Sequence, residues 1–229
     1  MNRIAVMLLG IFAVLALSWT GLVLSNQRSY GALQPFISKD DNKAYPEQLP
    51  GIAAQGKQVY QDLGCAYCHT QEVVPATISA DVKRGWGERQ SYVRDYIRED
   101  RVLLGSLRLG PDLRNIGSRK PVTGRAYDEA WHYRHLYDPT SVSPGSNMPS
   151  YAFLFETRKI VGERSPNAVA FANAKEGFEV VPSARAESLV AYLLSLKNAY
   201  NYPEEAGKVY VAPKKEGKEG ADAAKKETK

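Results

Sequence analysis

Both cysteines of the chain lie in one short run, Cys65-Ala66-Tyr67-Cys68-His69. A Cys-x-x-Cys-His run is typical of the covalent attachment site of a c-type haem. Because the cysteines are spaced i and i+3, both sulfurs face the same side of a helical turn, toward the two vinyl groups of one porphyrin. His69, four residues after Cys65, reaches the iron from that side as the proximal ligand. The run therefore predicts one covalent haem c, held by Cys65 and Cys68 and ligated by His69.

The same cysteines could instead form a disulfide or a thioredoxin-like redox pair, or bind zinc in a membrane-anchored adaptor. A redox pair is expected in a βαβ context, whereas the surrounding sequence has the pattern of helix and loop. A structural zinc site usually combines two separated ligand pairs, and the chain has no further cysteine. These observations favour the haem interpretation.

A second axial ligand is expected for a haem that only transfers electrons. Apart from Met1 and Met7 in the N-terminal apolar segment, the only methionine is Met148, within a loop rich in proline and glycine. A methionine in such a loop has no helical apolar stripe to join, and Pro149 favours an extended backbone at the preceding residue. We predict that Met148 is the distal ligand.

Two histidines compete with this methionine for the iron. His132 and His135 are spaced i and i+3 on a short predicted helix, so both could face the pocket. We predict instead that they lie at the surface or contact a haem propionate. A Met/His ligand pair raises the haem potential, which suits delivery of electrons to oxygen or a comparably strong acceptor. An open sixth position would instead indicate a haem enzyme or gas sensor.

The N-terminal segment predicts a membrane anchor. No charged residue occurs from Ile4 to Leu24, and a helix of this length spans about 30 Å at a rise of roughly 1.5 Å per residue. A cleaved signal peptide has a shorter apolar core of roughly 7–15 residues. We therefore predict an uncleaved, single-pass anchor over residues 1–28 in contact with membrane lipid. Because c-type haem is attached on the outer face of the membrane, the chain after Ser25 is expected to be periplasmic.

The rest of the chain divides by composition. Residues 29–50 are polar and contain proline, as in a linker, and residues 51–200 have the length of one domain. Residues 201–229 are rich in Lys, Glu, Ala and Gly and cannot bury enough apolar surface to offset their ordering entropy, so we expect a disordered, charged tail. The net charge of +5 is modest, and nothing in its distribution predicts nucleic-acid binding.

Helical patterns predict a mainly α fold in which two helices bracket the haem domain. The first covers about residues 52–63, and the second begins after the candidate N-cap Ser183 and runs to about Tyr200. Small cytochromes c pack their first and last helices together, and Gly56 would permit a close approach. The expected architecture is a transmembrane helix followed by a cytochrome c-like helical domain with long loop insertions.

Residues 110–119, Gly-Pro-Asp-Leu-Arg-Asn-Ile-Gly-Ser-Arg, resemble the loop of small cytochromes c that passes the proximal histidine. The resemblance implies that the Pro111 carbonyl accepts a hydrogen bond from Nδ1–H of the proximal histidine and fixes its tautomer. It also implies that Arg119 binds a haem propionate.

Five features in order resemble one family more closely. They are a single anchor, Gly-Cys-Ala-Tyr-Cys-His-Thr-Gln, Gly-Pro-Asp-Leu, Trp-His-x-x-His-Leu-x-x-Pro and Asn-Met-Pro-x-Tyr. Together they are similar to the mono-haem cytochrome c subunit, subunit II, of cbb(3)-type haem–copper oxidases. The cytochrome c subunit of nitric oxide reductases has a similar plan, but the Trp-His-x-x-His-Leu block favours the oxidase.

This resemblance implies an electron-transfer subunit of a respiratory complex with no catalytic site of its own. Electrons would come from a soluble or membrane cytochrome c and pass through one haem to a haem–copper catalytic subunit, with a further cytochrome c subunit as partner. The location implied is the bacterial inner membrane, with the haem domain in the periplasm.

Two features go beyond the family pattern or depart from it. The family commonly has an arginine before the proline that follows the haem motif, whereas Val74 precedes Pro75 here. Segments 76–107 and 156–181 are long for a small cytochrome c, and connections of that length are usually functional or disordered. We expect both segments to dock on partner subunits.

Overall fold

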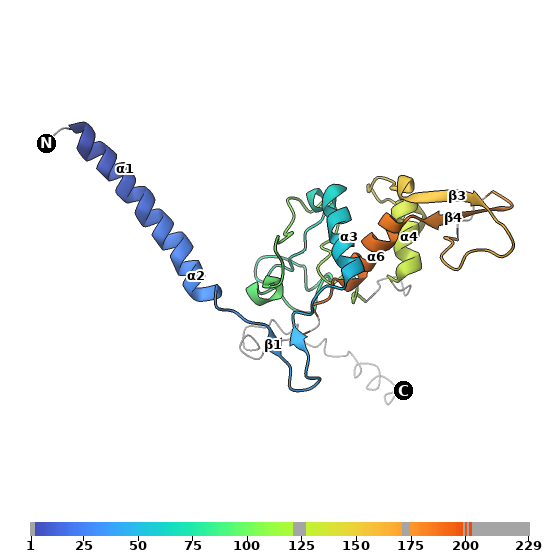
Figure 1. Ribbon diagram of the computed structural model, residues 1–229, viewed down its shortest axis with the longest axis horizontal. Helices are drawn as coiled ribbons and strands as arrows, with labels where there is room; N and C mark the ends of the chain where they lie inside the picture. The colour runs from blue at the N-terminus through green and yellow to red at the C-terminus, as the bar shows by residue number, and fades with distance from the viewer. Residues whose placement is uncertain (1–2, 121–126, 171–174, 199, 201, 203–229) are drawn as a thin grey trace, which may run out of the picture.

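The computed structural model of the chain describes residues 3–120, 127–170, 175–198, 200 and 202. Within these residues the fold is mainly helical with two small two-stranded sheets, and one long apolar helix stands apart at the N-terminus (Figure 1). The predicted fold class, a mainly α chain with one N-terminal helix, is confirmed. Except for Tyr202, the predicted tail over residues 201–229 lies outside the described residues.

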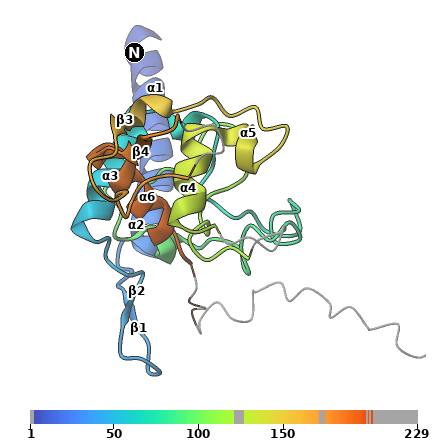
Figure 2. The same cartoon turned by 90° about the vertical axis from the view of Figure 1, so that its right-hand side faces the viewer.

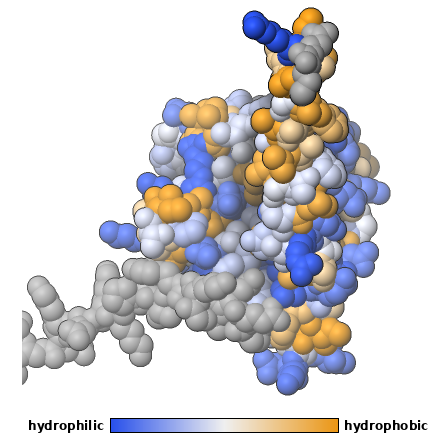
Figure 3. All heavy atoms as spheres, turned by 90° about the vertical axis from the view of Figure 1, so that its left-hand side faces the viewer, coloured by the Kyte–Doolittle hydropathy of each residue, from blue (hydrophilic) through white to orange (hydrophobic). Residues whose placement is uncertain are grey.

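The N-terminal helix has the length and surface of a membrane anchor. It consists of α1 (Arg3–Trp19), a π-helical turn (Thr20–Leu24) and α2 (Ser25–Tyr30), and runs continuously over 28 residues. No residue of its most apolar stretch is buried against the rest of the chain. Exposed hydrophobic side chains occur from Ile4 to Leu24, and many of them are seen in the view from this side of the molecule (Figure 3). Such an uncovered apolar surface fits a helix whose solvent is lipid.

Two helices far apart in sequence form the centre of the domain. Helix α3 (Gly51–Asp62) packs across α6 (Ala184–Ser195), as Figure 1 shows. Ser183 caps α6, because its side chain accepts a hydrogen bond from Ala186 N–H. Gly56 lies at the crossing, where an added Cβ would stand 1.8 Å from the carbonyl oxygen of Ser188. The predicted packing of the first and last helices, with Gly56 at the contact, is therefore confirmed.

Helix α6 ends earlier than its apolar pattern predicts. The pattern continues toward Tyr200, but the helix stops at Ser195 and Leu196 is already extended, with ψ of 90°. The Leu196 carbonyl accepts from Gly117 N–H at 3.1 Å, and Asn198 N–H donates to Asn115 Oδ1 at 2.8 Å. These tertiary hydrogen bonds replace the helical ones, so the chain leaves the helix to join the 115–117 loop.

The remaining elements surround this pair. Helix α4 (Glu129–Tyr137) contacts α6 and is followed by the short α5 (Pro139–Val142). Strand β3 (Phe155–Lys159) pairs antiparallel with β4 (Phe178–Pro182), so segment 156–181 forms a hairpin. Segment 76–107 is loop apart from one 3-10 turn, Val93–Tyr96. One buried cluster drawn from α3, α4, α6 and the loops between them forms the core.

The segment predicted as a linker contains more structure than a tether. Strands β1 (Phe36–Ile37) and β2 (Ala44–Tyr45) form an antiparallel pair that projects below the helices in Figure 2. The Tyr45 ring stacks on Tyr200, with ring centroids 4.4 Å apart. Tyr202, which the composition assigned to the tail, is only 2% exposed. The folded part of the chain therefore includes residues on both sides of the predicted 51–200 domain.

Candidate haem site

The Cys-x-x-Cys-His run folds into a tight turn at the end of α3. Gly64 stops the helix with φ of +72°, a left-handed conformation that glycine adopts without a Cβ clash. Residues Cys65–Tyr67 form a single 3-10 turn, and His69 N–H donates to the Cys65 carbonyl at 3.0 Å. The motif thus makes one helical turn from Cys65 that the His69 N–H closes, which brings the two cysteines and the histidine close together.

The surroundings of His69 favour the neutral imidazole. Nδ1 of His69 lies 2.8 Å from the carbonyl oxygen of Pro111. A carbonyl can only accept, so Nδ1 carries the proton and the lone pair is at Nε2. Burial lowers the pKa of His69, which favours the same neutral form. The His69–Pro111 hydrogen bond that the cytochrome c resemblance implied is present, and it leaves Nε2 available to a metal.

Gly110 makes room for the imidazole ring. A Cβ at this position would lie 2.2 Å from Cε1 and 2.7 Å from Nδ1 of His69. Gly110 N–H also donates to the Cys68 carbonyl at 2.9 Å. The backbone of the 110–111 loop therefore lies directly against the motif, and only glycine permits that distance.

A buried carboxylate ties this loop to the residues after His69. Asp112 is fully buried, and its Oδ2 accepts from Thr70 Oγ1 at 2.6 Å and from Glu72 N–H at 2.7 Å. Its Oδ1 accepts from Arg114 N–H at 2.9 Å. These bonds fix the position of the Pro111 carbonyl relative to the histidine. Sequence reasoning missed Asp112, although a carboxylate directly after a Gly-Pro turn could have been noted.

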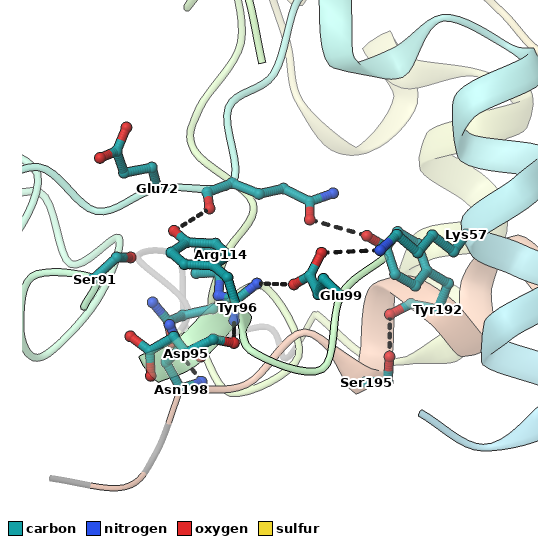
Figure 4. A network of polar contacts seen from close by, with 12 residues as sticks. Lys57, Glu72, Ser91, Asp95, Tyr96, Glu99, Arg114, Tyr192, Ser195 and Asn198 are labelled. Atoms are coloured by element: carbon teal, nitrogen blue, oxygen red, sulfur yellow. Dashed lines mark hydrogen bonds and ion pairs between the residues drawn. The ribbon is translucent and has the colours of Figure 1, made fainter. Parts of the chain in front are cut away.

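Further hydrogen bonds connect the motif to α3 and α6 (Figure 4). Arg114 Nη1 contacts Glu99 at 2.7 Å, and the other oxygen of Glu99 binds Lys57 Nζ at 2.9 Å. The Tyr192 hydroxyl on α6 donates to the side-chain oxygen of Gln71 at 2.9 Å. Removing one partner of such a buried network leaves a charge or dipole without compensation, so the network makes the site rigid.

Three buried nitrogen atoms near His69 have no hydrogen-bond partner among the described residues: Arg119 Nε, His132 Nε2 and His135 Nδ1. The four side chains interact electrostatically with one another, His69 with Arg119 and His135, and His132 with Arg119 and His135. Burial lowers the pKa of His132 and of His135 to about 4. Buried donors without partners are costly, and haem propionates are the kind of acceptor that would satisfy them. The residues present therefore fit a haem.

Met148 packs against the same hydrophobic core as the haem motif. It is partly buried and packs against the hydrophobic cluster that Cys65 also contacts. Tyr151, which follows it in the loop, interacts electrostatically with both cysteines, although burial is the main reason that the pKa of Tyr151 is raised. The loop of Met148 and helix α4, with His132 and His135, both border the site. The distal role of Met148 stays a prediction.

Both cysteines are half-buried free thiols. Cys65 and Cys68 are not joined in a disulfide, and burial raises the pKa of Cys65 to about 11. A thiol with a raised pKa is little ionised near neutral pH, which disfavours a thioredoxin-like redox pair, because that role needs the thiolate. Among the described residues, no group of three or more His, Cys, Asp or Glu side chains is arranged to hold a metal ion. The geometry therefore supports the haem interpretation over the redox-pair and zinc alternatives.

The Arg108 guanidinium lies close to Val74, the position at which an arginine is common in the family that the sequence resembles. Arg108 Nη2 donates to the carbonyl of Glu72 at 2.7 Å, and its Nη1 contacts both oxygens of Asp81 at 2.7 Å. Asp81 Oδ2 also accepts from Val74 N–H at 2.9 Å. The segment that follows the motif is thus held by Arg108, which lies much later in the sequence than Val74.

One comparison with known proteins identifies the chain. A family model described as cytochrome C oxidase, mono-heme subunit/FixO, matches residues 6–199. A search of curated proteins found no match. The matched range contains nearly all of the anchor, the whole of the site and the bracketing helices, and it corresponds to subunit II of the cbb(3)-type oxidases. The chain therefore belongs to the FixO family of mono-haem cytochrome c oxidase subunits.

Proposed function

We propose that the chain is a membrane-anchored c-type cytochrome that relays electrons through one covalent haem to the oxygen-reducing subunit of a cbb(3)-type oxidase. The observation that carries the proposal is the hydrogen bond between His69 Nδ1 and the Pro111 carbonyl inside a Cys-x-x-Cys-His turn. That arrangement prepares a neutral imidazole beside two half-buried thiols. Family membership supplies the complex in which it works.

Each residue of the site has a distinct task in this proposal. Cys65 and Cys68 would attach the haem through thioethers, and His69 and Met148 would hold its iron. Pro111 sets the basicity of the imidazole, Arg119 would pair with the charge of the propionates, and the neutral His132 would donate a hydrogen bond to them. The haem supplies one-electron chemistry when it is bound. No general acid, base or nucleophile is needed, so the residues only hold and orient the haem and shield it from water.

The proposal also locates the haem domain relative to the membrane. The helix Arg3–Tyr30 fixes the chain in the bacterial inner membrane, with the haem domain on the periplasmic side. A soluble or membrane-bound cytochrome c, together with a further cytochrome c subunit, donates the electrons. The haem–copper catalytic subunit receives them.

Purification of the native complex tests the function. Extraction in mild detergent through a C-terminal tag on this chain is expected to bring down subunits carrying b-type haem and copper, with oxygen consumption driven by reduced cytochrome c. Replacing both Cys65 and Cys68 by serine should abolish haem staining of this subunit on a denaturing gel and the cytochrome c-driven activity. A complex that reduces nitric oxide but not oxygen would contradict the oxidase assignment. A chain without haem staining would contradict the cytochrome assignment.

The assignment of Met148 as distal ligand leads to a spectroscopic prediction. A methionine sulfur on ferric haem gives a weak charge-transfer band near the red end of the visible spectrum. We expect the oxidised protein to show this band and Met148→Leu, which conserves volume but removes the sulfur, to lose it completely. The haem potential should fall in the same variant if a stronger donor takes the site, because the Met/His pair is what keeps it high.

The matched control is His132→Asn, which alters the rival residue on α4 and should keep the band. Loss of the band in His132→Asn but not in Met148→Leu would reverse the assignment. An oxidised wild-type spectrum without any such band would favour an open distal position and a haem enzyme or sensor.

A further inference from the structure

One buried carboxylate of the domain lacks the arginine partner that the other described buried carboxylates have. The ion pairs of the others are Asp81–Arg108, Asp95–Arg89 and Glu179–Arg158, with N···O distances of 2.7–2.8 Å. Asp112 is fully buried, yet no described lysine or arginine side chain forms an ion pair with its carboxylate. A buried charge without a partner is costly, so a compensating charge is expected close to Asp112.

The hydrogen bonds of Asp112 hold its charge in place without neutralising it. Its oxygens accept from the Thr70 hydroxyl at 2.6 Å, from Glu72 N–H at 2.7 Å and from Arg114 N–H at 2.9 Å. All three donors are neutral groups, and a side chain that only accepts hydrogen bonds has the character of an ionised carboxylate. The Arg119 guanidinium donates to the backbone carbonyl of Asp112 and not to its carboxylate. Among the described residues, the negative charge of Asp112 is therefore fixed but not compensated by direct contact.

The Asp112 charge lies beside the proximal ligand. Thr70 directly follows His69, and Asp112 directly follows Pro111, whose carbonyl oxygen lies 2.8 Å from His69 Nδ1. Burial lowers the pKa of His69, and the Asp112 charge acts on this pKa in the opposite direction, so the two groups interact. Interactions between buried charges are screened much less than those at the surface. A positive charge on a metal bound to His69 would therefore be stabilised by Asp112.

We propose that Asp112 tunes the reduction potential of the haem, because its buried carboxylate stabilises the ferric state and so lowers the potential. The proposal rests on the proposed function, since it needs a haem iron bound to His69. Ferric haem carries one positive charge more than ferrous haem, and this charge would be the partner that Asp112 lacks. When a donor cytochrome c gives one electron to the iron, the donor is oxidised and the iron is reduced, with no bond or proton exchanged. That electron arrives against the field of Asp112.

Redox titration of the full chain in detergent, with its single haem, tests the proposal. Asp112→Asn keeps the size of the side chain, removes the charge and turns one acceptor oxygen into a donor. We expect the midpoint potential to rise in this variant, because ferric iron loses a stabilising charge. An unchanged potential would overturn the proposal.

The matched control is Thr70→Val, which removes the 2.6 Å hydrogen bond to Asp112 and keeps the charge. Its midpoint potential should rise much less than that of Asp112→Asn. Equal rises in the two variants would also overturn the proposal, because the lost hydrogen bonding alone would then explain both.

Infrared spectroscopy of the wild-type chain gives a test that does not depend on the folding of a variant. In a chain that carries isotopically labelled aspartate, the oxidised-minus-reduced difference spectrum should contain a carboxylate band assigned to aspartate, because Asp112 is the aspartate that acts on His69. A difference spectrum without an aspartate band would overturn the proposal. Haem staining separates the two proposals. A chain without haem would contradict the proposed function and this inference together, whereas a haem-loaded chain that shows neither effect would contradict the tuning role alone.

Discussion

Gly56→Ala is expected to destabilise the domain by about 3 kcal/mol or more. In an ordinary helix this change stabilises by roughly 0.5–1 kcal/mol, because alanine loses less backbone entropy. Here the new Cβ would stand 1.8 Å from the Ser188 carbonyl oxygen and 2.7 Å from Tyr192 Cβ. The Ser188 carbonyl belongs to the backbone of α6 and cannot move by a change of rotamer. Helices α3 and α6 must therefore separate along their whole contact. Ordinary overpacking costs about 1–3 kcal/mol, and this contact is tighter than most.

Thermal unfolding of the haem-loaded domain measures the effect. A loss of about 3 kcal/mol lowers Tm by roughly 6–12 °C for a domain of this size. Gly51→Ala is the control, because it lies in the same helix and a Cβ there has nothing within 4 Å. Equal Tm values for the two variants would show that the helices do not meet closely at Gly56.

Gly110→Ala is expected to disturb the proximal ligand while sparing the fold. Its Cβ would lie 2.2 Å from Cε1 of His69, so the imidazole must move away from the Pro111 carbonyl. Without that hydrogen bond the imidazole is less basic and stabilises ferric iron less, so the haem potential rises. A hydrogen bond worth about 0.5–1.5 kcal/mol corresponds to roughly 20–65 mV for one electron.

Redox titration with optical detection measures this shift, and the ferric spectrum should gain a high-spin component as the His69–iron bond lengthens. Gly51→Ala again serves as the control, since it changes a glycine far from the ring. An unchanged potential in Gly110→Ala would mean that the proximal hydrogen bond does not tune this haem. An unfolded Gly110→Ala protein would be detected by its circular dichroism and would contradict the expectation that only the ligand is affected.

Local features of the site could be predicted from the sequence because they depend on spacing along one short segment. The Cys65–His69 turn, the anchor and the N-cap at Ser183 follow from helical geometry and composition. The His69–Pro111 contact was also expected, but only through resemblance to small cytochromes c. Its partners are 42 residues apart, and no periodicity links them.

Features that join distant loops could not be predicted in this way. Segment 29–50 has the composition of a tether, and the partners of its rings stand beyond α6. The sequence places Tyr200 at the end of a predicted helix and Tyr202 in a tail whose composition predicts disorder. The end of α6 at Ser195 is likewise decided by bonds to the 115–117 loop and not by helix propensity.

The sequence by itself thus determined that this protein has a membrane helix, one haem-attachment motif and two bracketing helices with a glycine at their crossing. Only the tertiary structure decided how rigidly these parts are joined. The bonds of the Asp112 carboxylate, the buried nitrogens near His69 that lack partners among the described residues, and the stacking of Tyr45 on Tyr200 all depend on how irregular segments are placed. Such contacts leave no periodic pattern in the sequence, because the residues are brought together by the closed core and not by a repeating helix or strand.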